Sequence, residues 1–230
     1  MNLDSYDWSH IGASLDDCGH AVLPRLMAPG QCSDLRALYA RDDAFRSRIV
    51  MARHGFGAGE YKYFAYPLPT LLNDLRGSLY RRLAPIANRW NGALKDAVDY
   101  PLELQDFTRR CHAAGQTRPT PLMLKYGPGD YNNLHRDLYG EHVFPLQATV
   151  LLSRPGLDFT GGEFVMTESG TPPPRVDIVP LEQGDAVIFA VHRRPCAGLR
   201  GTRRVAMRHG VSRIHEGERY TLGVIFHDAA

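Results

Sequence analysis

The sequence lacks paired cysteines, a long apolar run and a strong charge of either sign. No CxxC pair is present, which excludes a zinc ribbon and a thioredoxin-type motif, so we expect free thiols at Cys18, Cys32, Cys111 and Cys196. No segment approaches the roughly 18 apolar residues that span a bilayer. The N-terminus also lacks the basic start and apolar run of a secretion signal. We therefore expect a cytoplasmic protein without a membrane partner.

The composition is that of a globular protein with one sizeable core. The chain has 230 residues, of which 43% are hydrophobic and 23% are charged, and it contains no low-complexity run. This length predicts a single domain. The formal charge of +2 is too small to indicate a nucleic-acid partner by itself. Local clusters of charge must therefore be considered instead.

Residues 1–120 are predicted to be mainly helical. Apolar residues recur at helical spacing in residues 68–94, and residues 101–115 resemble a second helix. Pro29 and Gly30 predict a turn before a further helical stretch. The strand-like segments in this part are short and are interrupted by glycine or proline: residues 20–24, 45–57 and 60–68.

From residue 121 onward the pattern changes to eight short alternating segments separated by glycine, proline and aspartate. Such a series is typical of a jelly roll or a small barrel. Helices followed by strands indicate an α+β chain in which the helical part supports one face of the sheet.

The stretch "YNNLHRDLYG" (131–140) contains a histidine and a carboxylate two positions apart, His135 and Asp137. On a strand, both side chains would leave the same face about 7 Å apart and could converge on one ion. One HxD or HxE motif is expected by chance in a chain of this composition. The motif therefore gains meaning only if a second histidine lies nearby, as a non-haem Fe(II) site requires.

His209 is the best candidate for that second histidine, because the strand after it supplies Arg219 ten residues further on. Counting by two places Arg219, Thr221 and Gly223 on one strand face, opposite an apolar face. An arginine on a pocket-lining face would bind a carboxylate through two parallel hydrogen bonds.

With these motifs in view, the sequence resembles the Fe(II)- and 2-oxoglutarate-dependent oxygenases, whose signature is HxD, a distal histidine and a basic residue about ten positions beyond it. The segments that carry the resemblance are "MLKYGPGDYNNLHRD", "FTGGEFVMTE", "PLEQGDAVIFAV" and "HGVSRIHEGERYTL". Over its whole length the chain is similar to a bacterial branch described as oxygenases that oxidatively demethylate damaged DNA.

The resemblance implies a single oxygenase domain over residues 1–230, with a double-stranded β-helix (jelly-roll) catalytic core in 121–228 and helical support with substrate-side loops in 1–120. It implies that His135, Asp137 and His209 hold Fe(II), and that 2-oxoglutarate and O2 are the cosubstrates. The cosubstrate would lie against three residues of the core strands: Arg219, Tyr126 and Thr221.

Three alternatives remain open from the sequence. His192 competes with His209 as the distal ligand, although Gly201 and Thr202 stand where its arginine would be expected. The substrate could be a protein side chain or a free amino acid, because Leu124 replaces an asparagine of the better-known DNA demethylases and the cosubstrate region resembles that of prolyl hydroxylases. A metal-binding barrel without catalytic activity is the third alternative.

Two further segments have both a functional and a structural interpretation. Residues 193–208 contain six arginines, which would either follow a phosphate backbone of alkylated DNA or form a solvated loop: Arg193, Arg194, Arg200, Arg203, Arg204 and Arg208. The aromatic and glycine-rich loop at 54–66 would either close over a substrate or cover a barrel edge. For His227, near the chain end, we expect a structural role.

Overall fold

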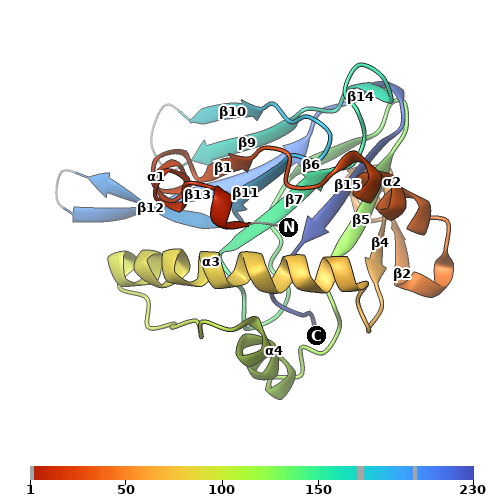
Figure 1. The fold of residues 1–230 in the computed structure, drawn as a ribbon. Coiled ribbons are helices and arrows are strands. Elements are labelled where there is room, and N and C mark those ends of the chain that lie inside the picture. Colours follow the sequence, from red (N-terminus) through yellow and green to blue (C-terminus); the bar gives the residue numbers. More distant parts are fainter. Residues whose placement is uncertain (1–2, 170–173, 199–200) are drawn as a thin grey trace.

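The computed structural model describes residues 3–169, 174–198 and 201–230 (Figure 1). Within these residues none of the helices is long and apolar enough to cross a membrane. The short 3-10 helices are Leu3–Ser5, Asp42–Ala44 and Met51–His54. The α-helices are α1 (Trp8–Cys18), α2 (Pro29–Leu38), α3 (Thr70–Leu94) and α4 (Leu104–Ala113).

The described strands form three antiparallel sheets. The larger sheet has the order β1-β11-β7-β15-β5-β4-β2, the second has the order β10-β9-β13-β6-β3 with β12 paired to β13, and β14 pairs with β8. The strands are β1 (His20–Leu23), β2 (Phe45–Val50), β3 (Gly57–Ala58), β4 (Glu60–Phe64), β5 (Leu122–Tyr126), β6 (Tyr131–His135), β7 (Leu146–Leu151), β8 (Phe159–Gly161), β9 (Phe164–Ser169), β10 (Arg175–Val179), β11 (Ala186–Ala190), β12 (Arg193–Gly198), β13 (Gly201–Val211), β14 (Ile214–Gly217) and β15 (Arg219–Val224).

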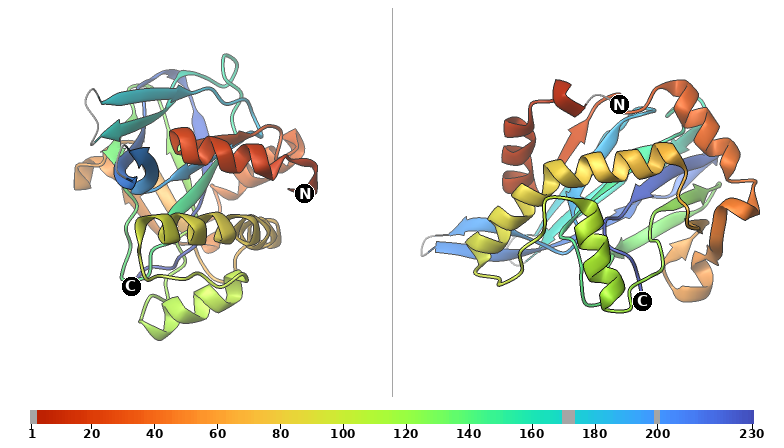
Figure 2. Two further views of the ribbon diagram at one scale, coloured as in Figure 1. Left: turned by 90° about the vertical axis from the view of Figure 1, so that its left-hand side faces the viewer. Right: turned by 60° about the horizontal axis from the view of Figure 1, so that its bottom comes forward.

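Strands that follow one another after residue 121 are divided between the two large sheets. β5, β7, β11 and β15 belong to the larger sheet, whereas β6, β9, β10 and β13 belong to the second. Helices α3 and α4 lie together on one side of these sheets (Figure 2). The fold is thus a mixed α and β structure dominated by antiparallel sheets, as the sequence predicts.

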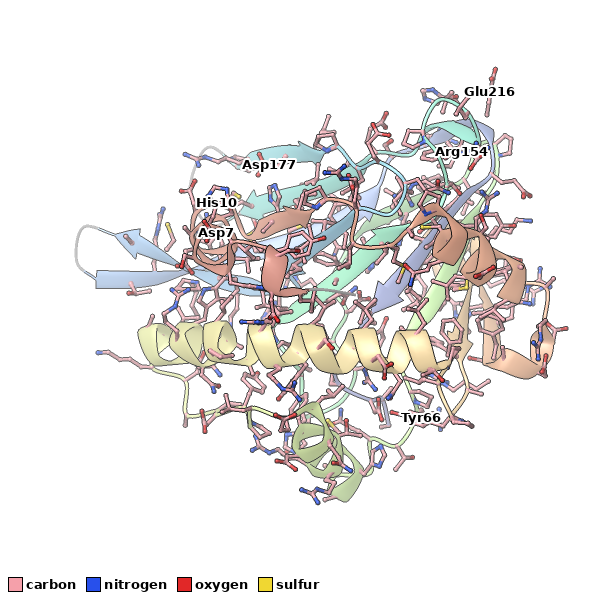
Figure 3. All side chains as sticks on the ribbon, in the orientation of Figure 1. Asp7, His10, Tyr66, Arg154, Asp177 and Glu216 are labelled. Atoms are coloured by element: carbon pink, nitrogen blue, oxygen red, sulfur yellow. The ribbon has the colours of Figure 1, made fainter. Side chains whose placement is uncertain are left out.

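Helix α3 provides much of the core beneath the sheets. Its apolar side chains recur every three or four residues, so they share one face, and they are almost fully buried: Leu72, Leu75, Leu79, Leu83 and Trp90. Burying each leucine contributes roughly 2 kcal/mol. Helix α1 is capped by Asp7, whose carboxylate accepts hydrogen bonds from the backbone N–H groups of Ser9 and His10 (Figure 3).

The part of the chain before residue 121 agrees with the prediction in its strands and differs at one turn. The predicted strand-like segments contribute β1, β2 and β4 to the larger sheet. β4 pairs with β5, and its aromatic residues Tyr61, Tyr63 and Phe64 suit a sheet. The predicted turn at Pro29 and Gly30 is the first turn of α2, since a proline fits the first position of a helix.

A buried ion pair connects α3 to the chain end. Arg76 and Asp228 are 2% and 0% exposed, and their side chains form an ion pair of 2.8 Å. The Tyr66 hydroxyl donates to the same carboxylate at 2.8 Å, and Tyr66 lies between α3 and α4 (Figure 3). His112 Nε2 lies 2.8 Å from Asp228 Oδ2.

We expect Arg76→Met to lower the free energy of unfolding by about 3–5 kcal/mol, because it leaves the Asp228 carboxylate buried without its cation. Arg81→Met on the same helix is the matched control. Arg81 pairs with Glu103 in an exposed ion pair, so its loss should cost no more than about 1 kcal/mol. Urea unfolding followed by circular dichroism measures both. Equal losses in the two variants would contradict the assignment of Arg76 as a buried anchor.

Candidate metal centre

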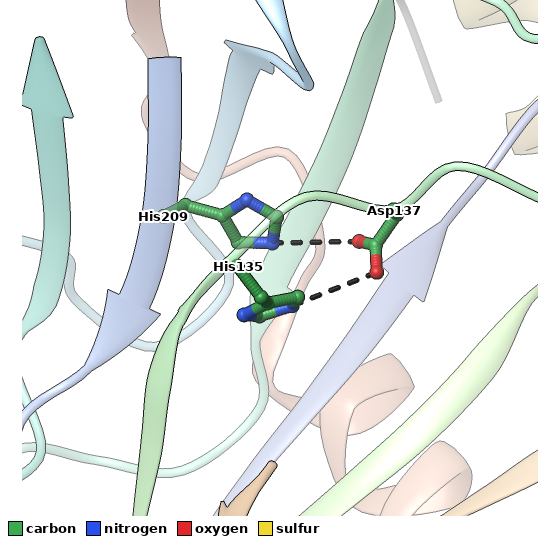
Figure 4. A group of neighbouring side chains, drawn as sticks. All are labelled: His135, Asp137 and His209. Carbon is green, nitrogen blue, oxygen red and sulfur yellow. Dashed lines mark ion pairs between the residues drawn. The ribbon is translucent and has the colours of Figure 1, made fainter. Parts of the chain in front are cut away.

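Three side chains, from β6, from the segment directly after it and from the neighbouring β13, converge in the cavity between the sheets. His209 on β13 lies directly opposite His135 at the end of β6, and Asp137 follows two residues later. One ligand atom from each of the three lies within 4.8 Å of the others. Asp137 contacts His135 Nε2 at 3.5 Å and His209 Nε2 at 3.4 Å (Figure 4). This arrangement of two imidazoles and one carboxylate suits a divalent transition metal.

The electrostatics of the cluster also favour a cation. His135 Nδ1 lies 2.8 Å from the Asn133 carbonyl oxygen, which only accepts, so Nδ1 carries the proton and Nε2 is free to bind a metal. Burial and the neighbouring His135 lower the pKa of His209, which favours the neutral imidazole. Burial opposes ionisation of Asp137, but its contacts with His209, His135 and Gln147 outweigh this and hold its pKa below the usual range.

A cavity of about 160 Å³ is lined both by this cluster and by Arg219. Arg219 is 2% exposed, and its Nε and Nη1 atoms have no hydrogen-bond partner among the residues that the structure describes. The guanidinium carbon lies 5.7 Å from the ring centroid of Tyr126 and 5.8 Å from that of Phe159. Burial lowers the pKa of Arg219 to about 10, so the guanidinium still carries its charge at neutral pH. A buried cation with free donors fits a carboxylate ligand.

Tyr126 and Thr221, the other predicted cosubstrate residues, line the same cavity. Arg219 lies opposite Tyr126 in the pairing of β15 with β5, and Thr221 follows on the same strand face. Tyr126 is fully buried, and its hydroxyl accepts a 3.4 Å hydrogen bond from Asn132. Strand parity therefore brings Arg219 and Thr221 into the cavity, and the pairing of β15 with β5 adds Tyr126, which the resemblance implied.

His192 lies apart from the cluster in the part of the chain that the structure describes. Its Nδ1 accepts a 3.2 Å hydrogen bond from Arg136, and its pKa is lowered by burial, by Arg136 and by Arg193. His227 is 1% exposed, and burial lowers its pKa to about 4. Its Nδ1 accepts from the backbone N–H of Phe144, an interior structural contact.

The arginine-rich segment forms the hairpin of β12 and β13, and most of its described cations already have acidic partners. Arg193 and Arg204 both contact Asp96, and Arg194, which is 2% exposed, pairs with Glu168. Arg200 lies outside the described residues. The described arginines that remain exposed without a carboxylate partner are Arg203 and Arg208. A phosphate-binding role for the whole segment is therefore not supported.

The 54–66 loop lies at the cavity. β3 pairs with β6, and Gly57 is required there because its φ is +130° and a Cβ atom would lie 2.4 Å from the Tyr131 carbonyl oxygen. Phe56 lines the cavity, is 46% exposed and stacks on His54 with ring centroids 5.5 Å apart. Tyr61 on β4 forms part of the cavity wall. The segment thus borders the candidate site, and through β4 it also covers the edge of β5 in the larger sheet.

Sequence reasoning missed several residues of this cavity. Tyr139 and Gln147 donate hydrogen bonds to Asp137, and Phe164 and Phe189 pack against His209. Tyr139 could have been found, because it follows Asp137 by two positions. Gln147, a polar residue in the fully buried strand β7, was a second available signal.

Comparisons with known proteins give the family. Residues 59–229 match the model of a family described as "oxygenase, catalysing oxidative methylation of damaged DNA". Two uncharacterized proteins of Mycobacterium tuberculosis are 47% identical over 171 residues, which cover 73% of this chain and 72% of theirs. The chain belongs to this family of oxygenases, so the family predicted from the sequence is confirmed.

Solved structures with a similar fold include two bacterial proteins. A prolyl-4-hydroxylase from Pseudomonas putida has a TM-score of 0.56 at 14% identity, with 94% of this chain and 96% of that one covered. An oxidoreductase of the 2OG-Fe(II) oxygenase family from Burkholderia pseudomallei has a TM-score of 0.56 at 15% identity, covering 100% and 96%. At these identities the likeness concerns the fold.

Proposed function

We propose that the protein is an Fe(II)- and 2-oxoglutarate-dependent dioxygenase in which His135, Asp137 and His209 hold the iron. The observation that carries the proposal is that one cavity contains both this cluster and a buried arginine with free donors. Bound Fe(II) would activate O2, which couples the oxidative decarboxylation of 2-oxoglutarate to succinate and CO2 to the hydroxylation of a substrate C–H bond.

The side chains of the cavity have distinct tasks in this proposal. Arg219 binds the far carboxylate of 2-oxoglutarate with its free Nε and Nη1 donors. Tyr126 and Thr221 line the same cavity as Arg219. Phe164 and Phe189 cover His209 and exclude water from that side of the metal site. A dry site strengthens the attraction between the guanidinium and its carboxylate.

The proposed catalytic core is a double-stranded β-helix, or jelly roll. Its strands would be the four of each large sheet between which the chain alternates: β5, β7, β11 and β15, and β6, β9, β10 and β13. The whole chain, 1–230, would be one domain. Residues 1–120 would add the helical support, three further strands of the larger sheet and the loop with Phe56.

For the substrate, we propose an N-methylated base in DNA. Phe56, exposed at the cavity and stacked on His54, offers a flat surface for a base. Arg136 also lines the cavity and is held by His192, so it is available for a neighbouring phosphate. Hydroxylation of an N-methyl group gives N–CH2OH, which breaks down to N–H and formaldehyde. The proposed reaction therefore removes the methyl group by oxidation, whereas the family's description is worded as methylation.

The test supplies the purified protein with Fe(II) and 2-oxoglutarate, first without O2 and then with it. We expect an absorption band that needs both Fe(II) and 2-oxoglutarate, and succinate formation that chelation by EDTA abolishes. With a single-stranded oligonucleotide containing 3-methylcytosine, we expect formaldehyde in an amount equal to the additional succinate.

The test distinguishes failure of the dioxygenase assignment from failure of the proposed substrate. Absence of both the band and succinate formation would overturn the dioxygenase assignment. Succinate formation without formaldehyde from the oligonucleotide would leave the dioxygenase in place and exclude this methylated base as a substrate.

A further inference from the structure

Asp137 is held on both of its carboxylate oxygens by side chains other than the two histidines. The Tyr139 hydroxyl lies 2.9 Å from Oδ1, and Gln147 Nε2 lies 2.8 Å from Oδ2. Tyr139 belongs to the segment after β6, whereas Gln147 belongs to β7 in the other sheet. Two independent elements of the fold therefore fix the orientation of one carboxylate.

The direction of both hydrogen bonds follows from the chemistry of the groups. An ionised carboxylate has no proton to give, so the Tyr139 hydroxyl and the Gln147 amide must both donate. This orientation leaves Gln147 Oε1 buried without a hydrogen-bond partner, although the side chain is only 5% exposed. A buried carbonyl left unpaired costs about 1–3 kcal/mol. The bond to Asp137 therefore determines how this amide is oriented.

Tyr139 is itself supported by a second tyrosine. Tyr63 on β4 is 8% exposed and packs edge-on against Tyr139 with ring centroids 6.4 Å apart. The Arg46 guanidinium lies 4.4 Å from the Tyr63 ring centroid. The donor to Asp137 Oδ1 thus has a fixed position before any metal binds.

We propose that Tyr139 and Gln147 are positioning residues that orient Asp137 for the metal and thereby set the metal affinity. The inference rests on the proposed function, because it needs Asp137 to be a metal ligand. A free aspartate side chain would lose rotational freedom when the metal binds. Here the two donors remove that freedom before the metal binds. Residues that hydrogen-bond to metal ligands strengthen metal binding in this way.

The test is a Co(II) titration of the full chain and two variants, Tyr139→Phe and Gln147→Met. Each variant removes one donor to Asp137 and leaves the three proposed ligands in place. We expect the Co(II) dissociation constant to rise about 10–100-fold in each. We also expect the visible absorption band of bound Co(II) to shift, since the carboxylate becomes free to rotate. A purely structural role would not alter that band.

Tyr131→Phe is the matched control. It makes the same chemical change on β6, but Tyr131 packs against Arg213, 5.0 Å from its ring centroid, and it does not border the cavity. Its Co(II) affinity and spectrum should equal those of the wild type. Tyr63→Phe leaves both donors to Asp137 intact, so it should weaken Co(II) binding less than Tyr139→Phe does.

Circular dichroism establishes that each variant is folded, and either positioning variant alone suffices for the test. Wild-type Co(II) affinity and an unshifted band in Tyr139→Phe or in Gln147→Met would overturn the inference and leave the proposed function intact. If the wild type binds no Co(II), the proposed function and this inference both fail.

Discussion

His135→Ala should remove bound metal and succinate formation together. The substitution leaves one imidazole and one carboxylate at a site where three ligand atoms lie within 4.8 Å of one another. Replacing a residue that hydrogen-bonds to a metal ligand typically lowers the metal affinity about 10–100-fold. Loss of a ligand itself should therefore cost more than about 100-fold. Metal content by elemental analysis and succinate by chromatography measure the two effects on the same sample.

His192→Ala is the control for this prediction. His192 contacts Arg136 and lies outside the cluster, so its replacement should leave the metal content of the protein unchanged. Loss of metal in His192→Ala but not in a His209→Ala variant would show that the distal ligand is His192. Retention of full metal content in His135→Ala would contradict the assignment of the site. A barrel that binds metal without catalysis would show no succinate formation even in the wild type.

Arg219→Leu should raise the KM for 2-oxoglutarate by at least about 100-fold without removing the metal. Each hydrogen bond between charged groups contributes about 1.5–3 kcal/mol. Loss of two such bonds corresponds to two or more factors of ten, because about 1.4 kcal/mol is a factor of ten. Arg219→Lys should show a smaller increase, because an ammonium group keeps the charge but not the two parallel donors. Initial rates of succinate formation across 2-oxoglutarate concentrations give the KM.

Arg213→Leu provides the comparison for Arg219. Arg213 is exposed, donates to the Gly129 carbonyl oxygen and does not line the cavity, so the KM should remain that of the wild type. An Arg219→Leu variant that binds metal normally and keeps the wild-type KM would exclude Arg219 as the carboxylate partner. In that case Arg136, the other arginine that lines the cavity, would become the candidate.

The local features of the fold were largely predictable from the sequence. The apolar spacing in 68–94 predicted α3, because a helix of 3.6 residues per turn brings those leucines onto one face. The two-residue period predicted which side chains of β15 enter the cavity, and Arg219 and Thr221 do so. Interruption of the strands by β-turn residues likewise predicted a second half made of short antiparallel strands.

The contacts between distant segments were less predictable, because local periodicity does not specify which strands pair or in which register. The HxD motif with a distal histidine suggested that His209 and His135 bind the same metal. Only the pairing of β13 with β6 places the two residues opposite each other. The pairing of β13 with both β12 and β9 brings Arg194 into a buried ion pair with Glu168, although its charge suggested an exposed residue.

The sequence by itself determined the periodic elements and the residue types at the candidate site, since these depend on neighbours along the chain. Only the tertiary structure decided that Gln147 on one sheet reaches Asp137 beside the other, and that Arg219 is buried without an acidic partner. Hydrogen bonding and burial depend on what lies across the cavity, and those neighbours are set by the packing of the two sheets.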